Sequence, residues 1–75
     1  MKFTSPTSGS LNFEQMYKTI MNFIREKPGY EYNLIVGTDS QPGINEAIFV
    51  TAIVIYRVGN GGRYFYHKNK TKLKV

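Results

Sequence analysis

Residues 32–58 read YNLIVGTDSQPGINEAIFVTAIVIYRV and contain two apolar runs separated by a polar segment. The first run, residues 32–38, is short and β-branched, as is typical of a strand that is buried on both faces. The second run, residues 47–58, is longer and almost continuously apolar. The segment between them, residues 40–46, carries a Pro-Gly turn signal. This pattern predicts two neighbouring strands, 32–38 and 47–58.

A third strand follows the second run. Residues 59–62 read GNGG, which is a turn sequence, and residues 63–67 read RYFYH with alternating character. We therefore expect a strand over 63–67 that pairs with the strand before it.

A helix precedes the strands. Apolar side chains recur at helical spacing over residues 13–27, and Pro28 and Gly29 end the pattern. Asn12 and Gln15 have the spacing of a capping box. These features predict a helix over 13–27.

The elements define an α/β type of fold, or an α+β fragment of one, in which one helix precedes a three-stranded antiparallel meander. Residues 1–10 are rich in Ser, Thr, Pro and Gly and are expected to form a flexible leader, with a single domain over residues 11–75. A strand that is apolar on both faces needs a layer on each side, and one helix covers only one side. We therefore expect either a truncated domain or a homo-oligomer that covers the open side of the sheet.

The composition narrows the classes of protein. The chain has 75 residues, which is one domain at most, and its formal net charge is +5. The absence of Cys, together with a single His, excludes disulfides and thiolate zinc sites. We see no secretory signal and no apolar stretch of about 18–20 residues, so we expect a cytoplasmic protein with no membrane partner.

Asp39 is the first candidate site residue, because it directly follows the apolar run at 32–38. A carboxylate at the end of a buried strand is costly to desolvate without a partner, and it is a suitable ligand for Mg²⁺. Asp39 and Ser40 are also residue types that cap turns. From spacing alone, the turn interpretation is favoured.

A resemblance to a known family favours the metal-ligand interpretation of Asp39 over the turn interpretation. The stretch FIREKPGYEYNLIVGTDSQ at residues 23–41, followed by AIFVTAIVIYRVG at 47–59, resembles the ribonuclease H-like YkuK family of bacterial proteins with predicted nuclease function. The resemblance implies a partial ribonuclease H-like fold, with Asp39 as a catalytic ligand of Mg²⁺ or Mn²⁺. It also implies that Ser40 and Gln41 face the groove for RNA, DNA or a hybrid of the two.

Such sites collect three or four carboxylates, and the resemblance implies that the others lie on elements after the third strand. The remaining acidic residues of the chain lack the placement of a second ligand, and they are Glu14, Glu26, Glu31 and Glu46. Hydrolysis with two metal ions needs several carboxylates, so we expect the 75-residue chain to be inactive and to bind no metal by itself. The alternative is a non-catalytic module that binds nucleic acid or mediates assembly.

Basic residues near the C-terminal end form the second candidate site. They lie beside Tyr64, Phe65 and Tyr66, and they are Arg63, Lys68, Lys70, Lys72 and Lys74. Lysines beside aromatic rings can hold phosphates while bases stack on the rings. A run of like charge is more commonly a solvated tail, and the alternation of lysines would also fit one face of a strand that continues the sheet.

Overall fold

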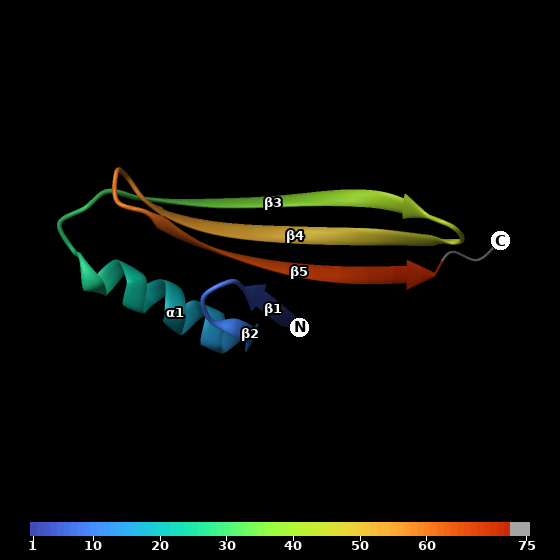
Figure 1. Ribbon diagram of the computed structural model, residues 1–75, viewed down its shortest axis with the longest axis horizontal. Helices are drawn as coiled ribbons and strands as arrows, with labels where there is room; N and C mark the ends of the chain where they lie inside the picture. Colours follow the sequence, from blue (N-terminus) through green and yellow to red (C-terminus); the bar gives the residue numbers. More distant parts are fainter. Residues whose placement is uncertain (73–75) are drawn as a thin grey trace.

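The computed structural model describes residues 1–72, which form one helix and a five-stranded sheet (Figure 1). In chain order the elements are β1 (Lys2–Ser5), β2 (Gly9–Asn12), α1 (Phe13–Glu26), β3 (Tyr32–Gly43), β4 (Glu46–Arg57) and β5 (Gly62–Lys72). The strand order across the sheet is β2-β1-β5-β4-β3, and every neighbouring pair is antiparallel.

The predicted α/β fold with a three-stranded meander is wrong, because β1 and β2 form a hairpin that extends the same antiparallel sheet. Thr4 of β1 pairs with Tyr66 of β5, so the segment expected to be a flexible leader is part of the fold. The alternation of β1 turns the side chains of Phe3 and Ser5 inward, and both are buried. Burial of one aromatic ring offsets part of the conformational entropy that ordering this segment costs.

The long hairpin of β3 and β4 is more regular than the sequence indicates. Its register runs without interruption from the pair Tyr32 and Arg57 to the pair Gly43 and Glu46. The connection is only two residues long, and Asn45 takes the left-handed conformation, with φ 57°, that a tight hairpin needs. The loop expected over 40–46 is therefore mostly strand. Pro42 is tolerated because β3 is an edge strand of the described sheet.

The helix begins where the capping box predicts. The Gln15 backbone N–H donates to Asn12 Oδ1 at 2.8 Å, and the Asn12 backbone N–H donates to Gln15 Oε1 at 2.9 Å. Two of the unpaired donors at the helix start are thereby satisfied. The helix α1 is too short and too polar to cross a membrane, and no other helix occurs in residues 1–72.

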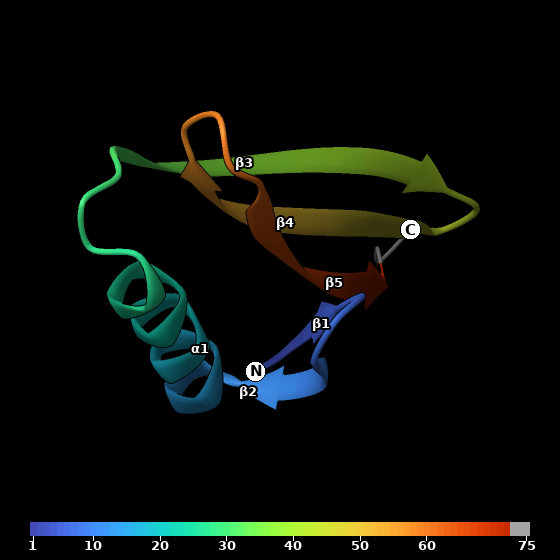
Figure 2. The same cartoon turned by 60° about the vertical axis from the view of Figure 1, so that its left-hand side comes forward.

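The core lies between α1 and one face of the sheet. It is built from Phe3, Met16, Phe23, Ile55 and Phe65. Figure 2 shows α1 and the β1–β2 hairpin on the same side of the β3–β5 ribbon. The expectation that the run at 32–38 is buried on both faces is wrong, because Leu34, Ile35 and Val36 of β3 are all more than half exposed.

The three long strands extend well beyond α1. The molecule measures 53 × 21 × 16 Å along its principal axes, and the ends of β3, β4 and β5 project as an arm past the helix (Figure 1). The arm carries Asp39 and the lysines of β5.

Candidate nucleic-acid interface

The sheet has one face toward α1 and one face away from it, and strand register assigns each residue to one of them. Leu34, Val36, Ile53 and Ile55 line a groove with α1, so the residues that alternate with them face the other way. We call this second surface the open face. On β5 it carries Tyr64, Tyr66, Lys68, Lys70 and Lys72.

Register brings the two candidate sites of the sequence to the same face. Asp39 pairs with Val50, and Val50 pairs with Lys68, so these three residues form one row across the sheet. Gln41, Ile48 and Lys70 form another row on the same face. Strands lie about 4.7–4.9 Å apart, so Asp39 and Lys68 flank β4 with roughly 9.5 Å between their backbones.

Ser40 does not belong to this group. Its position between Asp39 and Gln41 on β3 turns its side chain to the opposite face, because successive side chains of a strand alternate. The fold therefore separates Ser40 from Gln41 and from the lysines of β5.

Asp39 lies in the middle of an exposed strand and not at the end of a buried one. Its Oδ1 atom accepts a hydrogen bond from the Ser40 backbone N–H at 2.9 Å, and the side chain is exposed to solvent. The desolvation argument for a bound cation therefore does not apply to it. The local hydrogen bond is the contact that the turn interpretation anticipates, although no turn occurs there.

The carboxylates of residues 1–72 do not fit a two-ion centre. No group of three or more His, Cys, Asp or Glu side chains in that range could hold a metal ion. Glu46 shares the open face with Asp39, but it pairs with Gly43, four residues further along β3. That separation is about 13 Å along the strand, whereas paired ions in such centres lie only about 4 Å apart.

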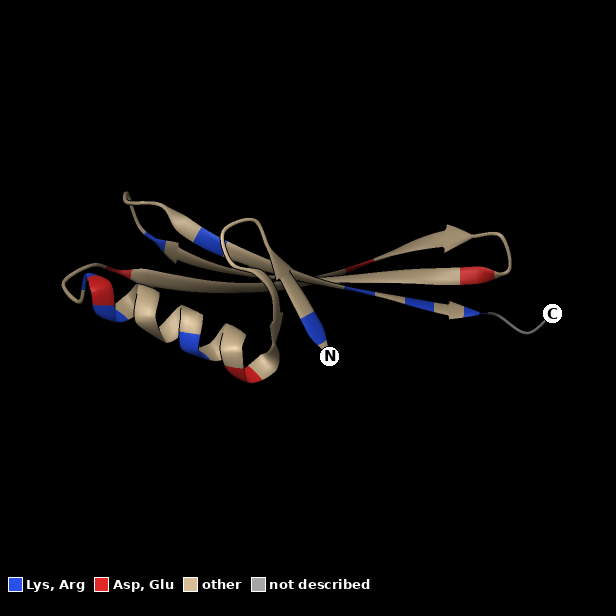
Figure 3. Cartoon of the chain, turned by 60° about the horizontal axis from the view of Figure 1, so that its bottom comes forward, with Lys and Arg blue, Asp and Glu red and all other residues tan. Residues whose placement is uncertain are grey.

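The lysines of β5 form a straight row on the arm. Lys68, Lys70 and Lys72 occupy alternate positions, so neighbouring side chains start about 6.7 Å apart. Figure 3 shows the basic positions along the projecting end of β5. Within residues 1–72 the ion pair formed is that of Lys18 with Glu14 on α1, although Glu46 of β4 is the register partner of Lys72. Lys74 lies outside the described residues.

Three tyrosines continue the open face toward the β4–β5 turn. Tyr56, Tyr64 and Tyr66 are 49%, 48% and 37% exposed, whereas Phe65 between the last two is fully buried in the core. Phe65 therefore does not belong with Tyr64 and Tyr66, and Tyr56, which its sequence position did not single out, joins them on the open face. The alternation of RYFYH was the signal that separates the core ring from the surface rings.

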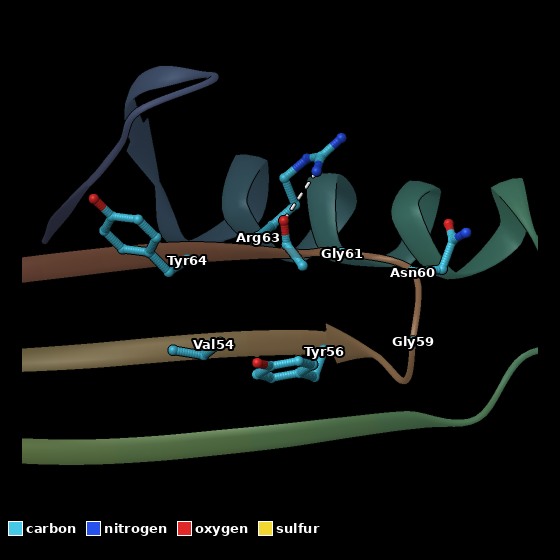
Figure 4. A pocket seen from close by; sticks show the side chains of 8 residues that line it. Val54, Tyr56, Gly59, Asn60, Gly61, Arg63 and Tyr64 are labelled. Atoms are coloured by element: carbon cyan, nitrogen blue, oxygen red, sulfur yellow. Dashed lines mark hydrogen bonds between the residues drawn. The ribbon is translucent and has the colours of Figure 1, made fainter.

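The tyrosine end of the open face is hollowed. Val54, Tyr56 and Tyr64 line an open hollow of about 520 Å³ together with the GNGG turn (Figure 4). Gly59 and Gly61 of that turn have φ angles of 74° and 86°, which favour glycine. The Arg63 side chain belongs to the α1 side, where its guanidinium lies 4.8 Å from the centre of the Phe23 ring.

The comparisons with known proteins give one match. Residues 15–75 match the family described as Ribonuclease H-like, and this range includes Asp39, the lysine row and the three tyrosines. No curated protein and no solved structure shows a significant match to the chain. The finer resemblance to the YkuK proteins stays a prediction. Since the matched range covers most of the 75 residues, the chain belongs to the ribonuclease H-like family.

Proposed function

We propose that the chain binds nucleic acid as part of a ribonuclease H-like nuclease that depends on Mg²⁺ or Mn²⁺. The observation that carries the proposal is the family match over residues 15–75, which contains both sets of candidate residues. Their common location on the open face supports it, because Asp39 and Lys68 belong to one row. In this proposal Asp39 contributes one oxygen ligand to the metal centre, and the lysines hold phosphates.

Hydrolysis would need more carboxylates than residues 1–72 bring together. One aspartate can fill one or two coordination positions of a cation, but it cannot hold two ions. A second candidate function is therefore a non-catalytic nucleic-acid-binding module, and the isolated position of Asp39 within the described residues favours it. The two candidates share the binding surface and differ in whether Asp39 acts on a metal ion.

The first prediction concerns activity. We expect the purified chain to leave RNA, DNA and an RNA–DNA hybrid intact in the presence of Mg²⁺ or Mn²⁺, because its acidic residues are scattered. Gel analysis of labelled substrates after prolonged incubation measures this. Metal-dependent cleavage that is lost in Asp39→Asn would contradict the expectation and would show that a complete site can form.

The same variant tests Asp39 as a ligand. If Asp39 is a ligand, dilute Mn²⁺ will broaden the NMR signals of the Asp39 and Ser40 amides, and Asp39→Asn will remove this broadening because a neutral amide is a poorer ligand. Glu46→Gln is the matched control, since it neutralises a carboxylate on the same face of the neighbouring strand. If the amide signal of residue 39 is still broadened in Asp39→Asn, the carboxylate of Asp39 is not a ligand.

We also propose self-association through β3. In the described part of the chain the outer edge of β3 has no pairing strand, and Asp39 is the one charged residue among its twelve. Natural edge strands usually carry more protection against pairing. We expect sedimentation equilibrium at micromolar concentration to show a dimer or larger species, and Ile35→Lys to shift it toward the monomer. A wild-type protein that stays monomeric at these concentrations would refute the proposal.

A further inference from the structure

We infer that the open face binds single-stranded nucleic acid, with bases stacked on Tyr56, Tyr64 and Tyr66 and phosphates held by Lys68, Lys70 and Lys72. The inference rests on the proposed nucleic-acid function and narrows it to one form of nucleic acid and one surface. The site is a track along β5 that changes from aromatic to basic. From Tyr64 to Lys72 it is about 27 Å long, which is enough for a short oligonucleotide.

The tyrosine end offers rings that a base can reach. Tyr66 pairs with Ala52, and Ala52 pairs with Gly37, so the row that runs from this ring across β4 and β3 holds only small residues. Tyr56 likewise pairs with Gly62. Exposed aromatic rings with small neighbours serve as stacking platforms for bases of any sequence.

The basic end supplies positive charge on β5, on the same face of the sheet as the tyrosines. Lys68, Lys70 and Lys72 lie on β5, whereas the carboxylates of this face belong to Asp39 on β3 and Glu46 at the start of β4. Phosphates are attracted by the lysines and repelled by the carboxylates. The nucleic-acid backbone should therefore follow β5, with its bases directed across β4.

The chemistry of the tyrosines selects a single strand over a duplex. In a duplex the faces of the bases are stacked on one another and cannot lie against a protein ring. In a single strand the bases can separate and stack on the tyrosines. Neutralisation of phosphates requires only the lysines, so the exposed rings beside them indicate that bases are contacted as well.

A second copy of the chain is a less suitable occupant of this face. Two open faces brought together would place both lysine rows in one interface, with only Asp39 and Glu46 from each copy to compensate. Of the exposed apolar residues of β3, Leu34 and Val36 face the α1 side, and Ile35 lies at the β3 edge of the open face. The lysines of β5 and the outer edge of β3 lie on opposite sides of β4, so they can serve different partners.

Fluorescence anisotropy with a labelled twelve-nucleotide oligothymidylate, its DNA duplex and its RNA–DNA hybrid tests the inference. We expect the single strand to bind more tightly than either duplex. Three phosphate contacts should give a slope of about −2 for log affinity against log salt, because each contributes about −0.7 on single strands. A triple variant with Lys68→Gln, Lys70→Gln and Lys72→Gln should lose at least tenfold in affinity in dilute salt and flatten this slope.

A double variant with Tyr64→Leu and Tyr66→Leu should lose about tenfold or more in affinity while it keeps the salt slope, because stacking involves no released ions. The matched controls change charge or rings on the other side of the molecule. They are Lys18→Gln with Arg25→Gln, and Tyr17→Leu with Tyr30→Leu. We expect each control to change affinity by less than about threefold, with circular dichroism confirming that all variants are folded.

The outcomes separate this inference from the proposed function. Equal or tighter binding of the duplex or hybrid, with no effect of the tyrosine variant, would overturn the single-strand inference and leave the nucleic-acid function standing. No binding of any form would refute both. Dissociation of a protein dimer by the tyrosine variant, in the absence of nucleic acid, would assign the open face to a second copy and would also overturn the inference.

Discussion

Phe65→Ala is expected to lower the free energy of unfolding by about 3–5 kcal/mol. Phe65 is fully buried, with 0% of its surface exposed, at the centre of the core that α1, β1 and the sheet share. A domain of this size rarely has more than about 3–5 kcal/mol of total stability. The variant should therefore be largely unfolded at room temperature, and urea titration followed by circular dichroism should show little or no folded baseline.

Phe49→Ala is the matched control, because Phe49 is the same residue type on the α1 side of the neighbouring strand. It is 40% exposed on the arm, beyond the core, so its truncation should cost at most half as much. If Phe65→Ala has no folded baseline in water, its unfolding can be measured in an osmolyte such as trimethylamine N-oxide. A cost for Phe65→Ala no larger than that for Phe49→Ala would show that the core is not centred on β5.

The elements with a clear hydrophobic pattern could be predicted from the sequence. The hairpin of β1 and β2 has no such pattern and could not. The capping box at Asn12 and the apolar stripe fixed the start of α1, and the apolar runs located β3 and β4. Phe3 is the only aromatic residue of β1, and a four-residue strand gives too few positions for a period to emerge. Its order depends on tertiary contacts that are distant in sequence, such as the tilted contact between the rings of Phe3 and His67, whose centres lie 5.8 Å apart.

The composition of the candidate site was predictable, but its arrangement was not. The lysines and Asp39 stand out in the sequence, whereas their common face depends on the exact residues of the β3–β4 turn. A turn over 40–46 leaves the register open, and a turn at Ile44 and Asn45 fixes Asp39 opposite Val50. Because a shift by one residue moves every side chain to the other face, small errors in a turn decide the composition of a site.

Arg57 has a structural role that the sequence hides, since an arginine next to a turn normally projects into solvent. It is only 4% exposed, and its guanidinium stacks 3.9 Å from the centre of the Phe23 ring. Its Nη2 donates to the Phe23 carbonyl at 2.7 Å, and its Nε donates to Tyr32 Oη at 3.1 Å. The Tyr32 hydroxyl in turn lies 3.1 Å from the Ile24 carbonyl.

The Arg57 bond satisfies the Phe23 carbonyl near the end of α1, while the Ile24 carbonyl also accepts from the Lys27 backbone N–H at 3.3 Å. Arg57 also places a positive charge at the negative end of the helix dipole. No carboxylate accompanies Arg57 in the contacts of residues 1–72. The Phe23 carbonyl and ring, the Tyr32 hydroxyl and the Asn60 side-chain oxygen compensate for its burial. The arginine therefore joins the end of β4 to the end of α1.

Arg57→Met is expected to destabilise the protein by about 2–4 kcal/mol, because it keeps most of the volume and leaves a buried carbonyl and hydroxyl without their donor. Arg63→Met is the matched control. Arg63 also lies over Phe23, but its side chain donates only to the carbonyl of the adjacent Gly62, so its loss should cost less than about 1 kcal/mol. Urea denaturation of both variants measures the difference.

A double-mutant cycle with Tyr32→Phe tests whether Arg57 acts through the helix end. The two residues share a hydrogen bond, and each also donates to a different carbonyl at the end of α1, so we expect a coupling energy of about 1–2 kcal/mol between Arg57→Met and Tyr32→Phe. The coupling should persist in 1 M salt, because buried contacts are screened much less than surface pairs. Additive effects of the two substitutions, or a coupling that salt removes, would mean that Arg57 contributes general surface charge and does not fasten β4 to the end of α1.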